Sequence, residues 1–275
     1  MTPTIPKNYY FHMTCRCNYS CIYCYHRHNR WDRFWMKELT TGEYFRYLKE
    51  LLVYSPAKIT LTGGEPLLRD DLKTITEYLL RTSPNPVFLS LNTNGSKVDA
   101  NNVKWLVESF DEISVSMDGF RSINDIVRGS GAFDRALKAV SMICDAGGIP
   151  SISITRTSLN NTQIEGFIGY MQHEWGIRSF RINEVKMIGR AKKSPWLYSG
   201  NCSCEKAKDA SPHSNDSCFI GQKCFEQTMN ILPNGDCYPC HYLQESSYYL
   251  GNVRKNPISD IFQRMNNMKN AYITS

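Results

Sequence analysis

Three closely spaced cysteines are the strongest chemical signal in this sequence. Cys17, Cys21 and Cys24 form a Cys-x3-Cys-x2-Cys run directly after a predicted strand. Ligands of α/β proteins bind at the carboxyl ends of strands, so this loop has the position of a binding site. Three thiolates on one loop can hold three irons of a [4Fe–4S] cluster and leave the fourth iron open to a further ligand. The spacing therefore predicts an iron–sulfur cluster with one open position.

A zinc ion is the alternative for this loop. Zinc takes four ligands, and the residues near the triplet that could supply the fourth are Cys15, His26 and His28. Structural zinc sites usually pair two short Cys or His knuckles, and a single triplet does not have that pattern. The triplet thus favours the cluster over zinc.

Four further cysteines near the C-terminus form a second candidate metal site. They are Cys218, Cys224, Cys237 and Cys240. The dipeptide Asn234-Gly235 favours a tight hairpin turn between strands predicted over residues 228–232 and 236–238. That hairpin would bring Cys224 to the cysteine pair that follows the turn. Four thiolates suit either a [4Fe–4S] cluster or zinc, so the residues alone leave both open.

The composition is that of an ordinary globular protein. The chain has 275 residues, of which 41% are hydrophobic and 21% charged, and this balance excludes the disordered and fibrous classes. The net charge of +6 is mild and is not by itself a nucleic-acid footprint. There is no long apolar run and no secretory signal, so we expect a cytoplasmic protein without a membrane segment. Thiols stay reduced in that compartment, and the 11 cysteines are therefore expected to be metal ligands or catalytic groups rather than disulfides.

Strand and helix patterns alternate over the first two thirds of the chain. Six strands are predicted over residues 9–14, 58–62, 87–92, 112–117, 151–155 and 178–183. The segments between them carry apolar residues at helical spacing. Two helix starts have capping-box spacing, Thr40 with Glu43 and Thr162 with Glu165. Strand–helix units in a row predict a parallel sheet covered by helices.

Polar residues alternate along one face of most of these strands. Examples are Thr60 and Thr62, Ser90 and Asn92, Ser114 and Ser116, Ser151 and Ser153, and Arg181 and Asn183. Parallel strands that are covered on both faces are normally apolar throughout. Bonds between neighbouring side chains explain one such strand easily and several poorly. We therefore predict a sheet curled into a partial barrel, with helices outside and a polar lumen for a ligand.

The composition changes after residue 191. Residues 192–223 are rich in Ser, Lys, Asp and Gly and poor in aliphatic residues, so they cannot bury much surface and are predicted to be a linker. Residues 224–275 are too few for an independent core without a staple such as a metal site. We therefore divide the chain into a barrel domain over 1–191 and a linker with a small metal-binding domain over 192–275.

Several short motifs together resemble those of the radical S-adenosylmethionine (SAM) superfamily. They are the cysteine triplet with Tyr23 before its last cysteine, Gly63-Gly64-Glu65-Pro66, Asn92-Thr93-Asn94-Gly95, Ser116-Met117-Asp118-Gly119 and Gly189-Arg190-Ala191. They cover residues 9–191 in the order and spacing of that family, and the set is far more specific than any one motif. The resemblance implies an α/β fold with a partial (βα)6 barrel.

The resemblance also implies the chemistry and the binding residues. In that family SAM chelates the open iron, an electron from the reduced cluster cleaves its sulfonium bond, and the resulting 5′-deoxyadenosyl radical abstracts a substrate hydrogen. An external donor of the flavodoxin or ferredoxin type would supply the electron. Carried over by motif, the SAM-binding residues are Tyr23 near the adenine, Gly63, Gly64, Glu65 and Pro66 at the methionyl amine, Asn94 and Ser116 at the ribose, and Arg128 at the methionyl carboxylate. A strand-end turn for Asn94 and a solvated charge for Arg128 are equally good interpretations.

The C-terminal cysteines resemble the extension called SPASM, or its shortened twitch form, which carries auxiliary [4Fe–4S] clusters. A full SPASM region continues with further cysteines, but none follows Cys240 here. We therefore expect one auxiliary cluster in a twitch extension made of a β-hairpin and a helix, held by the four cysteines above, with Cys202 or Cys204 as substitutes for Cys218. Four protein ligands would close every iron, so this cluster is expected to take an electron and to favour net oxidation. Three ligands would leave an iron that could anchor the substrate instead.

Three further features are weaker signals. His241 directly follows Cys240 and could accept the proton that a substrate loses on oxidation, although a surface histidine of a hairpin is the simpler interpretation. Cys144 lies on an apolar helix face and is expected to be a core thiol. The segment 26–35 interleaves basic and aromatic residues, which could grip an acidic substrate or form a solvated face.

We expect a radical SAM enzyme that dehydrogenates or cross-links residues of a ribosomally made peptide. The cluster motif begins at Cys17, so no leader-binding domain is expected before it, and a separate protein would have to bind the leader peptide. The alternative is a dehydrogenase of a small natural-product intermediate, such as an aminocyclitol or a sugar. A non-enzymatic metal module is a remote third interpretation, because it leaves the SAM motifs and the polar lumen unused.

Overall fold

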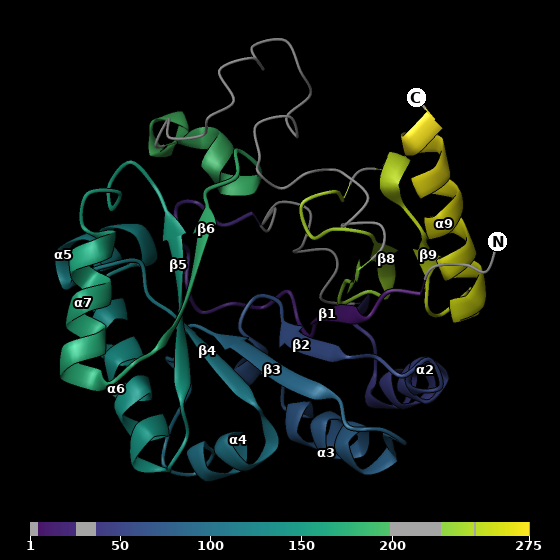
Figure 1. Cartoon of the computed structure of the whole chain (residues 1–275), viewed down its shortest axis with the longest axis horizontal. Helices are drawn as coiled ribbons and strands as arrows, with labels where there is room; N and C mark the ends of the chain where they lie inside the picture. The colour runs from purple at the N-terminus through teal and green to yellow at the C-terminus, as the bar shows by residue number, and fades with distance from the viewer. Residues whose placement is uncertain (1–4, 26–36, 199–226, 245, 275) are drawn as a thin grey trace.

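The computed structural model describes residues 5–25, 37–198, 227–244 and 246–274. Its centre is one nine-stranded sheet in the order β6-β5-β4-β3-β2-β1-β7-β8-β9. The edge strands β6 and β9 do not pair with each other in this part of the chain, so the sheet curls but stays open (Figure 1). The partial barrel predicted from the sequence is confirmed.

The first six strands are parallel and match the predicted strands within one or two residues. They are β1 (Asn8–His12), β2 (Lys58–Thr62), β3 (Phe88–Thr93), β4 (Glu112–Ser116), β5 (Pro150–Arg156) and β6 (Ser179–Glu184). Each of the first five pairs in parallel with the strand that follows it in the chain. The carboxyl ends of the strands therefore meet at one end of the sheet.

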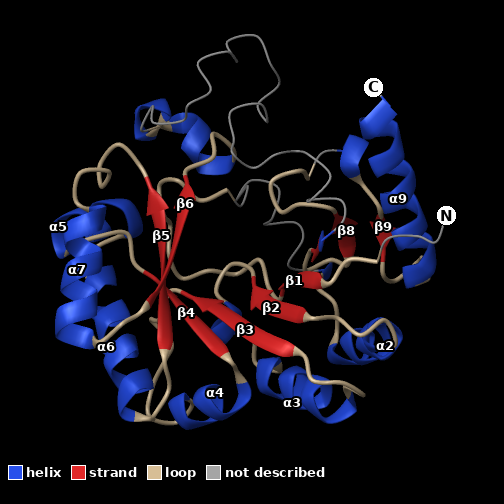
Figure 2. Cartoon of the chain, in the orientation of Figure 1, coloured by secondary structure: helices blue, strands red, loops and turns tan. Residues whose placement is uncertain are grey.

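Helices connect successive strands and cover the outer face of the sheet (Figure 2). They are α2 (Thr41–Leu52), α3 (Leu72–Thr82), α4 (Val103–Ser109), α5 (Arg121–Arg128), α6 (Ala132–Asp145) and α7 (Ile164–Trp175). The capping box of Thr40 and Glu43 is present. The predicted start at Thr162 is wrong, because α7 begins at Ile164 without a side-chain cap and Asn160 organises the preceding turn. No helix of the described residues is both long and apolar enough to cross a membrane.

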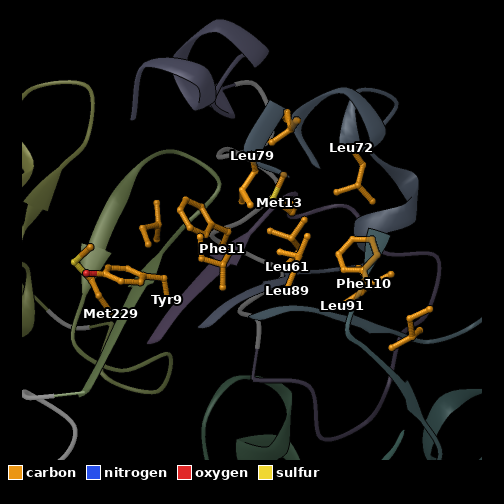
Figure 3. Packing of buried hydrophobic residues seen from close by; sticks show 14 of the residues in the cluster. Tyr9, Phe11, Met13, Leu61, Leu72, Leu79, Leu89, Leu91, Phe110 and Met229 are labelled. Atoms are coloured by element: carbon orange, nitrogen blue, oxygen red, sulfur yellow. The ribbon is translucent and has the colours of Figure 1, made fainter. Parts of the chain in front are cut away.

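The hydrophobic core lies between the outer face of the sheet and these helices. Figure 3 shows part of it, with side chains of β1, β2 and β3 packed against residues of α3 and of the C-terminal strands. Tyr9, Phe11 and Leu61 of this core are at most 2% exposed. Successive residues of a strand point to opposite faces, so the residues between them, such as His12 and Thr62, line the lumen.

The C-terminal segment adds a hairpin and a helix, as predicted. Strand β8 (Asp236–Tyr238) pairs antiparallel with both β7 (Thr228–Ile231) and β9 (Gly251–Asn252), and helix α9 spans Ile258–Thr274. The sequence did not predict that β7 pairs in parallel with β1, so that the hairpin continues the barrel sheet. The predicted domain boundary after residue 191 falls inside the short 3-10 helix Gly189–Lys193, and that division stays a prediction.

Candidate functional site

A cavity of about 260 Å³ opens at the carboxyl ends of the parallel strands. Its wall is formed by the ends of β1 to β6, by the loop after β1 and by residues 241–242 of the C-terminal segment. Parallel α/β sheets bind their ligands at this end. Most of the lining side chains are polar or aromatic, so the polar lumen expected from the strands is present.

All three cysteines of the triplet line this cavity. Within their loop, the Cys24 N–H donates to the Cys21 carbonyl (3.2 Å). The Arg190 N–H donates to the Cys24 carbonyl (2.9 Å), so the segment after β6 also fixes the loop. Burial raises the pKa of the Cys17 thiol to about 12. Metal ligation needs thiolates, so cluster assembly on this loop must release protons.

Gly63 and Gly64 run directly beside the cysteine loop and line the cavity. The Gly64 N–H donates to the Thr14 carbonyl (2.8 Å), and the Glu65 N–H donates to the Arg16 carbonyl (2.8 Å). Gly63 has a φ of +134°, and a Cβ on Gly64 would lie 2.1 Å from the Arg16 carbonyl oxygen. Only glycine permits so close an approach of two backbones.

Glu65 and Pro66 lie behind the glycines, outside the cavity wall. The Glu65 carboxylate is fully buried and accepts hydrogen bonds from the Thr93 hydroxyl (2.8 Å) and the Asn94 N–H (2.7 Å). Burial raises the pKa of Glu65, and these hydrogen bonds limit the rise. The side chain therefore ties the motif after β2 to the motif after β3.

Asp118 joins Tyr23 and Arg128 in a buried network. The Arg128 guanidinium donates to the Asp118 carboxylate through Nε (2.7 Å) and Nη2 (3.1 Å), and the Tyr23 hydroxyl donates to the same carboxylate. The Asp118 and Arg128 side chains are 0% and 8% exposed. Arg128 is thus a buried ion-pair partner rather than a solvated charge, and both it and Tyr23 line the cavity.

Asn94 and Ser116 also reach the cavity. The Asn94 amide donates to the Asn18 side-chain oxygen (3.0 Å), and its own oxygen accepts from the Ser96 N–H (2.9 Å). The Asn94 side chain therefore stabilises the turn after β3 and also lines the cavity. Ser116 ends β4 and is half-buried. The fold thus gathers all the predicted SAM-binding residues except Glu65 and Pro66 around one cavity.

The C-terminal hairpin brings a second cysteine pair to this region. Cys237 on β8 and Cys240 just after it are buried, and the next two residues, His241 and Tyr242, line the cavity. The His241 ring lies 5.5 Å from the Tyr25 ring and 4.0 Å from the Tyr242 ring, between centroids. Burial raises the pKa of the Cys237 thiol. The other predicted ligands fall outside the described residues, and they are Cys218 and Cys224 with their substitutes Cys202 and Cys204.

Two protein-family models match this chain. The model of the radical SAM superfamily matches residues 11–168, and the SPASM model, described as an iron–sulfur cluster-binding domain, matches residues 218–273. The first match alone spans more than half of the chain. This protein belongs to the radical SAM superfamily.

Curated radical SAM relatives match between 60% and 88% of this chain. Pre-heme d1 synthase of Dinoroseobacter shibae is 31% identical over 187 residues, which are 67% of this chain and 45% of that protein. Fe-coproporphyrin III synthase of Methanosarcina barkeri is 31% identical over 166 residues, 60% of this chain and 40% of that protein. Mycofactocin maturase MftC of Mycobacterium tuberculosis is 25% identical over 270 residues, 88% and 66% of the two chains. The chain therefore spans less than half the length of the first two relatives.

Solved radical SAM structures share the fold of nearly the whole chain. The structure of anSMEcpe with bound AdoMet has a TM-score of 0.71 at 18% identity and covers 97% of this chain and 82% of that one. Streptococcus suis SuiB bound to the precursor peptide SuiA has a TM-score of 0.72 at 15% identity and covers 94% of this chain and 65% of that one. The C-terminal segment is thus part of the shared fold.

Radical SAM enzymes bind a [4Fe–4S] cluster and SAM, and SPASM domains bind auxiliary iron–sulfur clusters. The residues of this site fit the first cluster and SAM. Three thiols line one cavity, and a close-packed glycine backbone lies beside them. A [4Fe–4S] cluster binds each thiolate through a different iron, so its ligands lie farther apart than those of a single metal ion. Within the described residues, no three His, Cys, Asp or Glu side chains lie close enough together to bind one ion.

Two acidic residues that were not among the predicted site residues support the radical SAM site. Glu38 accepts hydrogen bonds from the Thr14 hydroxyl (2.8 Å), the Cys15 N–H (2.8 Å) and the Cys15 thiol (3.1 Å), and so fixes the start of the cysteine loop. It belongs to no motif, so nothing in the sequence marks it. Asp118 has a signal, because it belongs to the motif Ser116-Met117-Asp118-Gly119 at the end of β4, but its partner Arg128 lies on a different element.

Proposed function

We propose that this chain is a radical SAM oxidoreductase that dehydrogenates or cross-links a ribosomally made peptide in the cytoplasm. The observation that carries the proposal is that one cavity contains the cysteine triplet and reaches the residues that follow the second cysteine pair. Its wall contains the cysteine triplet and also His241 and Tyr242, which directly follow Cys240. A substrate in this cavity would lie beside the site of hydrogen abstraction and beside the cysteines proposed to hold an auxiliary cluster.

The residues of the chain position the reactants and handle the proton. When bound, the reduced cluster and SAM supply a 5′-deoxyadenosyl radical that abstracts a hydrogen atom from the substrate. Gly63 and Gly64 line the cavity and would offer their backbone to the methionyl part of SAM, and the hydrogen bond to Asp118 fixes the Tyr23 ring in the cavity wall. His241 lines the same cavity and is proposed to accept the proton that the substrate loses, because imidazole gains a proton near neutral pH.

An oxidation also needs an acceptor for one electron. Cys237 and Cys240 are buried next to the cavity wall, and we propose that they hold a single auxiliary [4Fe–4S] cluster together with cysteines of the preceding segment. Iron–sulfur clusters exchange single electrons over a wide range of potentials. A flavodoxin or ferredoxin would reduce the first cluster, and a separate protein would bind a leader peptide.

Support for a peptide substrate comes from the relatives and from the open fold. MftC is named a mycofactocin maturase, and SuiB was solved with its precursor peptide. Within the described residues the sheet is open, because β6 and β9 do not pair, and an open sheet suits a substrate longer than the cavity. A second candidate is a dehydrogenase of a small natural-product intermediate, such as an aminocyclitol or sugar. It is supported by relatives whose names denote small-molecule chemistry, among them pre-heme d1 synthase and a probable GTP 3′,8-cyclase of Halobacterium salinarum.

Product analysis with candidate substrates tests the proposal. The anaerobically reconstituted protein is incubated with SAM, a reductant and each short peptide encoded beside its gene. We expect 5′-deoxyadenosine together with a peptide that has lost two hydrogen atoms. Unchanged peptides beside an oxidised sugar or aminocyclitol would favour the second candidate. No 5′-deoxyadenosine from a protein fully loaded with iron would contradict radical SAM chemistry in this chain.

A further inference from the structure

Arg181 is a cation of the cavity wall that makes no hydrogen bond within the described residues. It lies on β6, and its side chain is 37% exposed and lines the cavity. Its ion pair with Glu112 is loose, because Nη2 lies 3.5 Å from Oε1. A guanidinium has five donors in a planar fork. Most of the hydrogen-bonding capacity of Arg181 is therefore open to a ligand in the cavity.

The carboxylate of Glu112 is already bonded to other groups. Lys58 Nζ lies 2.7 Å from Oε2, and the hydroxyls of Ser90 and Ser151 donate to the two oxygens (3.0 and 3.1 Å). Burial acts to raise the pKa of Glu112, but the Lys58 bond and the nearby charges of Lys58 and Arg181 hold it below its ordinary value. Glu112 is thus ionised at neutral pH, and two cations share its single charge. A net positive charge remains at Arg181.

The other acidic groups at the wall do not cancel this charge. Glu184 lines the cavity and pairs with Arg156 (3.0 Å). The Asp118 carboxylate is bonded to Arg128. Lys186, also in the wall, lies 5.6 Å from the centre of the Tyr242 ring. The wall near β6 therefore favours an anion.

Side chains with neutral donors lie on the strand positions near Arg181. In the register of the sheet Arg181 lies opposite Ser153, which lies opposite Ser116, and Asn183 lies opposite Thr155. All five of these residues line the cavity. Among the described residues, the Arg181 guanidinium beside hydroxyls and an amide matches the single charge and the two oxygens of a carboxylate, which the guanidinium fork binds in a bidentate way.

We propose that Arg181 binds a carboxylate of the substrate and thereby orients the substrate in the cavity. This inference rests on the proposed function, since it names the chemical class of the substrate at the same site. In the order of the sheet, β6 and β1 are the two ends of the run formed by strands β1 to β6, and β7 follows β1. The cysteine loop follows β1, and β6 is the strand farthest from β1 in the order of the sheet. Arg181 on β6 therefore holds the substrate from the side of the barrel away from the strand that leads into the cysteine loop.

Arginine labelling tests the proposal without any turnover. The reconstituted full chain is treated with phenylglyoxal, and labelling of each arginine is mapped by mass spectrometry in the presence of succinate, succinamide or inorganic phosphate. Succinate is expected to protect Arg181 at a concentration about tenfold lower than succinamide. A difference of about tenfold in affinity is what one charge-assisted hydrogen bond contributes. Arg178, exposed and just before β6, is the internal control and should be labelled equally throughout.

Two blocked amino acids identify the source of the carboxylate. N-acetylglutamine carries only the main-chain carboxylate of a chain end or a small acid, whereas the α-amide of N-acetylglutamate carries only a side-chain carboxylate. Preferential protection by either one supports the proposal and names the source. Equal protection by succinate and succinamide, protection by neither, or stronger protection by phosphate than by succinate overturns it.

Variants link the protection to the side chain itself. Succinate should raise the unfolding temperature of the wild type and of Arg178→Gln, but not that of Arg181→Gln, and Arg181→Lys should recover only part of the shift because it keeps the charge without the fork. A succinate shift that persists in Arg181→Gln would contradict the proposal. If carboxylates protect Arg181 from labelling but no peptide is oxidised, only the assignment of a peptide substrate is wrong. If a peptide is oxidised but carboxylates do not protect Arg181, only the inference on Arg181 is wrong.

Discussion

Arg254 of the C-terminal segment and Glu43 of α2 form an ion pair across 211 positions of the chain. Arg254 Nε lies 2.6 Å from Glu43 Oε1, and Nη2 lies 3.0 Å from Oε2. Arg254 also donates to the carbonyls of Lys37, Glu38 and Asn234 (2.7, 2.8 and 3.0 Å). One guanidinium thus holds the hairpin turn, the start of α2 and the segment that contains Glu38 together. The C-terminal segment is in this way fastened to the support of the cysteine loop.

Replacing Glu43 by Gln should reduce stability in a pH-dependent way. Glutamine keeps the capping interaction but loses the ion pair with Arg254, and we expect a loss of about 1 kcal/mol, or about 2 °C in the unfolding midpoint. The Arg254 hydrogen bond lowers the pKa of Glu43 from 4.5 to about 2. A lowered pKa stabilises the fold above pH 4.5, and this contribution is lost as the pH falls toward 2. Thermal unfolding of the iron-free chain should show the two proteins converging over that range.

Glu77→Gln is the matched control for this pair. Glu77 faces Lys73 one helical turn away at 3.8 Å, and both side chains are more than half exposed. Its replacement is expected to leave the midpoint nearly unchanged. A constant difference between wild type and Glu43→Gln from pH 7 down to pH 2 would show that the ion pair with Arg254 does not stabilise the fold.

Asp118→Asn should destabilise the protein far more. Asparagine would leave the buried Arg128 guanidinium without its counter-charge, and breaking a buried pair in this way costs about 3–5 kcal/mol. The Thr155 N–H and the Tyr23 hydroxyl also bond to this carboxylate, so the ring of Tyr23 would lose its anchor. Urea unfolding measures the loss, and equilibrium dialysis with labelled SAM measures the accompanying fall in affinity.

Two further variants separate the charge from the general effect of substitution. Arg128→Met combined with Asp118→Asn removes both charges and is expected to cost less than Asp118→Asn alone. Asp134→Asn breaks the exposed pair with Arg121 and should change stability by less than about 0.5 kcal/mol. A double variant less stable than Asp118→Asn would show that the pair does not act through an uncompensated charge.

The parallel strands could be predicted because each carries its own local signal. Residues 58–62 alternate and are bounded by turn residues, and β2 spans the same residues. Helix starts depend on more distant partners. Thr40 caps α2 as expected, but the turn before α7 is held by Asn160, which donates to the Asp118 and Thr155 carbonyls. No local pattern encodes such contacts between elements, and the pairing of β7 with β1 is missed for the same reason.

The same distinction between local motifs and contacts between distant elements holds for the site residues. The cysteine triplet, Gly63 and Gly64 were predicted because a short motif specifies each of them, and they do line one cavity. Glu65 belongs to its motif too, yet its carboxylate points to Thr93 and Asn94, which lie at the end of the next strand, β3. Only the fold shows which side chains of a motif face the ligand and which hold neighbouring loops together.

Removing cysteines should remove iron in units of one cluster. A chain with two [4Fe–4S] clusters holds about eight irons after reconstitution, and replacing either Cys237 and Cys240 or the whole triplet by Ala should leave about four. Loss of the triplet should also abolish reductive SAM cleavage, whereas loss of the C-terminal pair should not. Iron and sulfide analysis and a 5′-deoxyadenosine assay measure the two effects.

Cys144→Ala provides the control for these variants. Cys144 is a half-buried thiol of α6 away from the cavity wall, and its replacement should leave both the iron content and SAM cleavage unchanged. About four irons in the wild type would mean that the C-terminal cysteines bind no cluster, and the proposed electron acceptor would be wrong. SAM cleavage that survives loss of the triplet would refute the assignment of the first cluster.

Gly64→Ala tests whether the glycine backbone shapes the cysteine loop. The added methyl group would lie 2.1 Å from the Arg16 carbonyl oxygen and 2.7 Å from its carbon, and these are backbone atoms between Cys15 and Cys17. The loop must therefore move, at a cost of about 1–3 kcal/mol. Because Cys17 moves with it, we expect lower iron occupancy of the first cluster and weaker SAM binding. Gly169→Ala on α7, where a Cβ meets nothing within 4 Å, should leave both unchanged. Wild-type iron content and SAM affinity in Gly64→Ala would show that the two loops are not held in close contact.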